Sequence, residues 1–109
     1  MNNINEGLTK ISDQTLMIVD DDDVFRNRLI TAMKRKGFDA YGASSVKEAK
    51  LLLREKSPKY AVIDLRLNDG NGLEIVSILS GSRSDSKIVM LTGYGLSLIH
   101  ISEPTRRYA

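Results

Sequence analysis

The chain has 109 residues, of which 41% are hydrophobic and 28% charged, and its formal net charge is +2 at pH 7. This is enough for one small domain, and the hydrophobic content argues against intrinsic disorder. The lack of cysteine excludes disulfides and thiolate metal sites, and a single histidine, His100, excludes a multi-histidine zinc site. The small charge excess gives no support to nucleic-acid binding, and no apolar run reaches the roughly 20 residues of a membrane span.

Residues 1–14 are polar and aperiodic, so they are predicted to form a flexible leader that lacks the features of a signal peptide, and a cytoplasmic protein is expected. Short runs of consecutive apolar residues follow, which are typical of strands buried on both faces of a parallel sheet. Three such strands are predicted over 16–19, 60–63 and 88–91. A weaker alternation predicts a short strand over 38–43.

Helical patterns lie between these strands. Apolar residues at spacings of three and four predict a first amphipathic helix that ends before Gly37: Phe25, Leu29, Ile30 and Met33. Ser45 and Glu48 have the spacing of a capping box, which predicts the start of a second helix. A third helix is predicted over 73–79.

This alternation of strands and helices predicts an α/β fold of three layers around a doubly wound parallel sheet, in the flavodoxin-like order 2-1-3-4. The pattern stops after Gly95. A fifth strand and the last helices are therefore expected to be missing, which leaves one sheet face partly open.

Polar residues follow three of the predicted strands at the same end. Asp20 and Asp21 follow the first, Asp64 follows the third and Thr92 follows the fourth. Ligands of such sheets bind beyond the carboxyl ends of the strands, so these side chains are expected to converge. Clustered carboxylates repel one another unless a cation such as Mg²⁺ joins them, and a carboxylate is also able to accept a phosphoryl group.

Taken singly, these residues have simpler interpretations. Asp22 and Asp23 precede a helix and fit a solvated helix start, while Asp64 and Thr92 fit turn positions. Only their conjunction at one end of successive strands favours a functional site.

Three stretches, MIVDDDDVFRNRL, AVIDLRLNDGNGLEIV and IVMLTGYG, resemble the receiver domain of bacterial two-component response regulators in order and spacing. The residues in these stretches are most similar to those of proteobacterial global redox regulators. The resemblance implies a receiver domain over 15–95 with the doubly wound fold.

The resemblance also implies roles for individual residues. Asp64 is the expected phosphoacceptor, which takes its phosphoryl group from a sensor histidine kinase, and Thr92 is the switch hydroxyl that binds that group. Mg²⁺ is expected to be held by Asp21, Asp64 and the backbone carbonyl of Arg66, with Asp20 acting through water. Such a domain is an acceptor rather than an enzyme. It forms a receiver dimer in the intact parent protein, and no nucleic-acid or membrane binding is expected of this chain.

The segment 96–109 departs from the family, because the lysine of the family's fifth strand, its switch aromatic and its last helix have no counterpart. This segment resembles translated sequencing adapter, so the expectation is a receiver truncated after its fourth strand and followed by a non-native tail. Alternatively, LSLIHIS is a genuine tail that pairs as a fifth strand.

Two other functions remain open on the sequence. In an aspartyl phosphatase of the haloacid-dehalogenase type, Asp20 is the nucleophile of the D-x-D pattern, but Asp64 then has no role. The third candidate is an interaction module, or an inert fragment, that is never phosphorylated.

Overall fold

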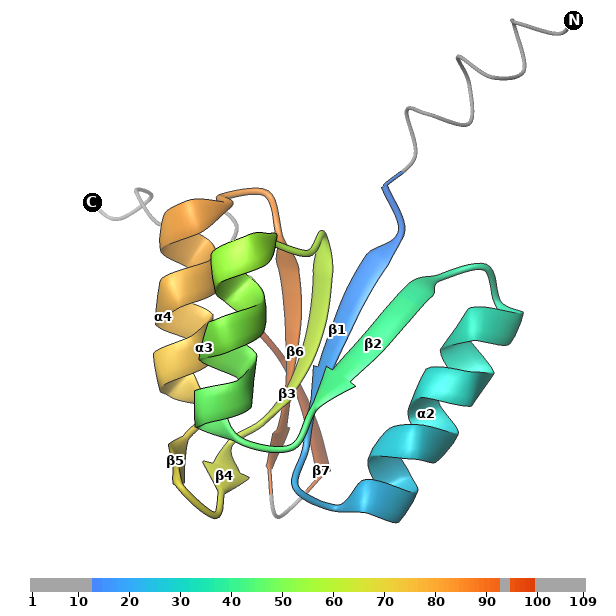
Figure 1. Cartoon of the computed structure of the whole chain (residues 1–109), viewed down its shortest axis with the longest axis horizontal. Helices are drawn as coiled ribbons and strands as arrows, with labels where there is room; N and C mark the ends of the chain where they lie inside the picture. The colour runs from blue at the N-terminus through green and yellow to red at the C-terminus, as the bar shows by residue number, and fades with distance from the viewer. Residues whose placement is uncertain (1–12, 93–94, 100–109) are drawn as a thin grey trace, which may run out of the picture.

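The computed structural model describes residues 13–92 and, for its backbone, residues 95–99. Its elements in chain order are β1 (Thr15–Val19), α2 (Asp23–Arg35), β2 (Asp39–Ala43), α3 (Val46–Glu55), β3 (Tyr60–Asp64), β4 (Arg66–Leu67), β5 (Gly70–Asn71), α4 (Leu73–Ser82), β6 (Lys87–Thr92) and β7 (Gly95–Ile99). Figure 1 shows one sheet between two helical layers. Within the described ranges, no helix is long and apolar enough to cross a membrane.

The main sheet has five strands in the order β2-β1-β3-β6-β7. The pairings β1–β2, β1–β3 and β3–β6 are all parallel, which confirms the predicted class and the predicted order of these four strands. Because parallel strands finish on the same side, β1, β3 and β6 all end at the lower edge of the view in Figure 1.

The sheet has a fifth strand, but this strand is not the parallel one that the sequence predicts to be missing. β7 pairs with β6 in antiparallel register, from Thr92 opposite Gly95 to Ile88 opposite Ile99. An antiparallel partner needs only a two-residue connection, whereas a parallel one needs a crossover of a dozen or more residues. The alternative expectation, pairing of this segment as a fifth strand, therefore holds for residues 95–99. His100, Arg106, Arg107 and the rest of the predicted tail lie outside the described residues, as do positions 1–12 of the predicted leader.

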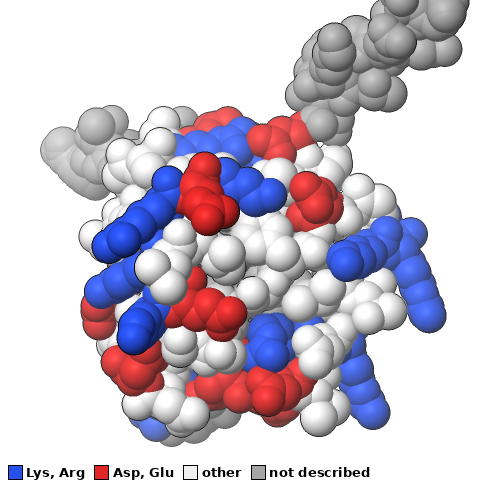
Figure 2. All heavy atoms as spheres, viewed as in Figure 1, with Lys and Arg blue, Asp and Glu red and all other residues white. Residues whose placement is uncertain are grey.

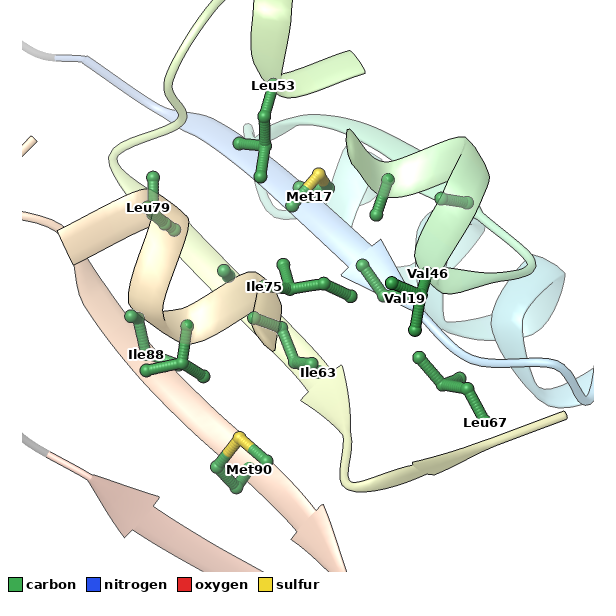
Figure 3. Close-up of a cluster of buried hydrophobic side chains, with 14 residues drawn as sticks. Met17, Val19, Val46, Leu53, Ile63, Leu67, Ile75, Leu79, Ile88 and Met90 are labelled. Carbon is green, nitrogen blue, oxygen red and sulfur yellow. The ribbon is translucent and has the colours of Figure 1, made fainter. Parts of the chain in front are cut away.

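The larger of two apolar cores lies between the sheet and the helices α3 and α4. Figure 3 shows side chains from β1, β3 and β6 meeting those of the two helices, with Leu67 of β4 beside Val46 at one end. On the other face α2 is the one described helix, and it covers a smaller cluster that includes Leu16 and Ile18. β1 and β3 are thus packed on both faces, which makes them a rigid support for the residues that follow them.

The predicted first helix packs through its middle and not through its start. Leu29, Ile30 and Met33 contact the smaller cluster, whereas Phe25 is 39% exposed. Asp22 is the N-cap, because its carboxylate accepts the Phe25 N–H at 3.0 Å. This agrees with the interpretation of Asp22 as part of a helix start.

The predicted capping box of the second helix forms only in part. The Ser45 hydroxyl accepts the Glu48 N–H at 3.0 Å. The Glu48 carboxylate accepts from the N–H and the hydroxyl of Ser44 instead of returning to the Ser45 N–H. The Glu48 carboxylate therefore accepts hydrogen bonds from the residue that precedes the one predicted by the capping-box pattern.

Candidate metal and phosphoacceptor site

Three carboxylates converge at the carboxyl end of the sheet. Asp20 and Asp21 follow β1 directly, and Asp64 is the last residue of β3, the hydrogen-bonded neighbour of β1. One oxygen of each carboxylate lies within 4.8 Å of the others. Figure 2 shows acidic side chains along the lower edge of the molecule, where these strands end in Figure 1. The structure thus brings together the carboxylates that the sequence places on one rim.

The environments of Asp20 and Asp64 disfavour the ionised forms of their carboxylates. Burial raises the pKa of Asp20, which is 6% exposed, and the neighbouring aspartates raise it further, while one hydrogen bond from the Asp22 N–H opposes the shift. Burial also raises the pKa of Asp64, together with the charge of Asp21 and against a hydrogen bond from the Arg66 N–H. A bound cation would favour the ionised forms and remove this repulsion.

The remaining predicted site residues lie beside this cluster. The Arg66 N–H donates to Asp64 Oδ1 at 3.2 Å, so the first peptide of β4 lies against the Asp64 carboxylate. Thr92 is the last residue of β6, and its neighbour Leu91 pairs with Asp64, which puts Thr92 at the same rim. The lysine implied by the family resemblance for a fifth strand is not found in β7, whose residues are all uncharged.

Arg26, near the start of α2, also contributes to this region. Its side chain is 14% exposed and donates from Nη1 to the carbonyl oxygen of Asp20 at 2.8 Å. Nη2 forms an ion pair with Asp23 at 2.8 Å. Arg26 therefore fastens the loop that carries Asp20 and Asp21 to the first turns of α2. The i,i+3 spacing of Asp23 and Arg26 was the one sequence signal for this contact.

A short hairpin follows Asp64. β4 and β5 pair Arg66 with Asn71 and Leu67 with Gly70. The chain then returns to β3, because the Gly72 N–H donates to the Leu65 carbonyl at 2.8 Å. The hairpin is thereby attached to the end of the strand that carries Asp64.

The donor set fits a hard divalent cation. Carboxylate oxygens are the ligands that Mg²⁺ and Ca²⁺ prefer, and three of them within reach of one ion supply the charge that such an ion needs. The half-buried position of Asp21 and Asp64 leaves part of the site open to solvent and to a reactant. Fold and site together define a doubly wound α/β domain with a cluster of three carboxylates at its carboxyl rim that could hold a divalent cation.

Comparison with known proteins places this domain in a family. The chain belongs to the response regulator receiver domain family, whose sequence model matches residues 16–100. This agrees with the resemblance seen in the sequence. The membership also counts against the phosphatase alternative, which leaves Asp64 without a role although Asp64 is part of the carboxylate cluster.

Individual relatives are similar over the same part of the chain. The photosynthetic apparatus regulatory protein RegA of Rhodobacter capsulatus is 50% identical over 84 residues, which cover 77% of this chain and 46% of that protein. The acid tolerance regulatory protein ActR of Rhizobium meliloti is 47% identical over 83 residues, which cover 76% and 43%. The chain thus spans a little under half the length of these two relatives.

Among solved structures, a response regulator from Burkholderia pseudomallei with a phosphorylated aspartic acid, a calcium ion and citrate is similar, with a TM-score of 0.71 and 29% identity. The match covers 76% of this chain and 49% of that one.

Proposed function

We propose that this chain is a phosphoacceptor receiver domain, and that Asp64 accepts a phosphoryl group from a sensor histidine kinase while Mg²⁺ is bound. The observation that carries the proposal is the convergence of Asp20, Asp21 and Asp64 at the end of two neighbouring parallel strands. The phosphorylated aspartic acid and the calcium ion in the similar Burkholderia structure support it.

In the proposed reaction an Asp64 carboxylate oxygen attacks phosphorus and forms an acyl phosphate. The bond between phosphorus and the donor's leaving atom breaks, and the leaving imidazole, or the carboxylate of a small acyl phosphate, keeps the electron pair. Bound Mg²⁺ supplies charge neutralisation for the phosphoryl oxygens. Asp21, Asp64 and the Arg66 carbonyl hold that ion, and Asp20 acts through water.

Thr92 lies at the same rim as Asp64, so its hydroxyl is the group proposed to bind the phosphoryl oxygens after transfer. Each chain accepts one phosphoryl group, which makes the domain a stoichiometric acceptor and not a catalyst of many turnovers. For the intact parent we propose a cytoplasmic transcription regulator with a receiver dimer. Support for the regulatory part of this proposal comes from RegA and ActR, which are both named regulatory proteins. Residues 15–95 are the proposed receiver unit.

The test is labelling with acetyl phosphate and MgCl₂, followed by intact-mass measurement and peptide mapping. We expect one phosphoryl group, on Asp64, and none after chelation of the metal. Asp64→Asn should remove the label. Asp39→Asn is the matched control, because Asp39 is an exposed aspartate at the start of β2, and it should keep the label.

Other outcomes would reject the proposal. A label that persists in Asp64→Asn and maps to Asp20 would restore the phosphatase alternative. A folded wild type that takes no label would identify an interaction module that is not phosphorylated.

A further inference from the structure

The β4–β5 hairpin carries the Arg66 carbonyl that the proposed function assigns to the metal. Each of its strands has two residues, so few hydrogen bonds of its own define its position. In Figure 1 the hairpin lies at the lower ends of α3 and α4, beside the start of α3. What holds the hairpin against these helices therefore decides where the Arg66 carbonyl lies.

Asp69, in the turn of the hairpin, is bonded to the start of α3. Its Oδ1 accepts the Val46 N–H at 2.8 Å, and its Oδ2 accepts the Lys47 N–H at 3.0 Å. The first N–H groups of a helix have no partner within the helix, and a carboxylate is a favourable acceptor for them. Both oxygens of one side chain thus connect two segments that are more than 20 residues apart in the sequence.

The helix does not depend on Asp69 for its own N-cap. Ser45 caps α3 through the Glu48 N–H, and Glu48 returns to Ser44. The two hydrogen bonds of Asp69 are therefore additional to the N-cap, and they fix the position of the hairpin relative to α3.

Two other residues of the hairpin pack closely against the start of α3. Leu67 is 7% exposed and belongs to the core that includes Val46. A Cβ at Gly70 would lie 3.2 Å from the Val46 side chain and 3.2 Å from the Glu74 carboxylate. The hairpin is thus held by an apolar contact on one side and by the Asp69 carboxylate on the other.

We propose that Asp69 is a positioning residue of the metal site: by bonding the start of α3 it holds the β4–β5 hairpin so that the Arg66 carbonyl can reach a divalent ion beside Asp64. This inference rests on the proposed function. It also predicts a reciprocal effect. If the hydrogen bonds of Asp69 to α3 increase the affinity for the metal, then bound metal must stabilise the start of α3.

The test is calorimetric titration of the full chain with Mg²⁺ for the wild type, Asp69→Ala, Asp69→Asn and Ser45→Ala. Asp69→Ala should weaken Mg²⁺ binding by about tenfold, the lower end of the effect of removing a residue that supports a ligand. Asp69→Asn loses the same charge but keeps one acceptor oxygen, so it should recover part of the affinity. Ser45→Ala removes a cap from the same helix without touching the hairpin, and it should lower the melting temperature while leaving Mg²⁺ affinity unchanged.

Hydrogen exchange supplies a second measurement that does not depend on affinity. Saturating Mg²⁺ should slow exchange of the Val46 and Lys47 amides, and Asp69→Ala should abolish this response.

Several results would overturn the inference. Equal Mg²⁺ affinity in Asp69→Ala and the wild type would do so, as would equal weakening in the alanine and asparagine variants, which would indicate a long-range charge effect. A wild type whose Val46 and Lys47 amides ignore bound Mg²⁺ would also overturn it. If the folded wild type binds no Mg²⁺ at all, the proposed function fails first and this role of Asp69 fails with it, which separates the two conclusions.

Discussion

Gly72 packs directly on the backbone of Asp64, so closely that a Cβ at residue 72 would overlap the Asp64 carbonyl oxygen and approach the Ile63 side chain at 2.9 Å. The nearest obstacle is backbone at the end of a buried strand, which has no room to move away. The geometry of the proposed phosphoacceptor therefore depends on a residue eight positions further along the chain.

Gly72→Ala should push the hairpin away from β3. We expect a loss of about 1–3 kcal/mol in the free energy of unfolding, the usual cost of overpacking, together with weaker Mg²⁺ binding. The matched control is Gly81→Ala, since a Cβ at Gly81 in α4 meets nothing within 4 Å. That substitution should stabilise the protein by about 0.5–1 kcal/mol, because alanine favours a helix over glycine. Urea unfolding of both variants checks this, and an equal effect of the two substitutions would contradict it.

Asp21→Asn should weaken Mg²⁺ binding on the order of a hundredfold, because Mg²⁺ affinity depends on the number of charged ligands at the site. Asp22→Asn should leave it nearly unchanged, since Asp22 caps α2 and asparagine caps a helix as well as aspartate does. Calorimetric titration measures both. Equal affinity in Asp21→Asn and the wild type would reject Asp21 as a ligand.

Removing one carboxylate of the cluster should stabilise the metal-free protein at neutral pH. The pKa of Asp64 is raised in the folded state by burial and by Asp21, so its protonation favours folding. This contribution is complete below the unfolded pKa of about 3.9 and disappears as the pH rises through the higher folded pKa. Asp64→Asn resembles the protonated form at every pH.

We therefore expect Asp64→Asn to melt at a higher temperature than the wild type at pH 7 in the presence of a chelator, with the difference shrinking as the pH falls. Mg²⁺ at a hundredfold excess over its dissociation constant should then stabilise the wild type by about 2.7 kcal/mol and the variant much less. If Asp64→Asn is instead less stable than the metal-free wild type at pH 7, burial and the charge of Asp21 do not disfavour the Asp64 carboxylate as proposed.

Asp13, at the other end of the sheet, should contribute to the free energy of unfolding with the opposite pH dependence. Its hydrogen bonds from the Thr15 hydroxyl and the Thr15 N–H, and then from Arg83, lower its pKa to about 2. A lowered pKa contributes stability above the unfolded value of about 3.9, which is lost as the pH falls through the folded value. The stability advantage of the wild type over Asp13→Asn should therefore be constant above pH of about 5 and shrink between about 4 and 2. Urea unfolding at a series of pH values measures it, and an advantage that does not change with pH would argue against the Asp13 contacts.

Local patterns in the sequence were sufficient for the parallel part of the fold. Apolar runs such as 16–19 and 60–63 indicate strands buried on both faces, and helices between them force parallel pairing. Since parallel strands finish on one side, the positions of Asp20, Asp21 and Asp64 after those runs already indicate a common rim. Periodicity also located the helices to within a few residues.

The fifth strand illustrates what such patterns leave undecided. The segment after Gly95 continues no strand–helix alternation, yet β7 forms because β6 offers an unpaired edge to a chain that reverses after Thr92. A sequence pattern reports burial and local propensity, whereas an edge becomes available only when the sheet is assembled.

The supports of the site were decided by the tertiary structure alone. In the sequence Asp69 is a typical turn residue, and Gly72 is one of two glycines in the same turn-rich segment. Their roles arise because the packing of α3 on the sheet brings Val46 to the hairpin, and because the hairpin folds back onto Asp64. Contacts between segments more than 20 residues apart depend on how whole layers pack, and no local pattern encodes them. The sequence by itself determined which residues are candidates for the chemistry, and only the packing of the layers decided which residues hold these candidates in place.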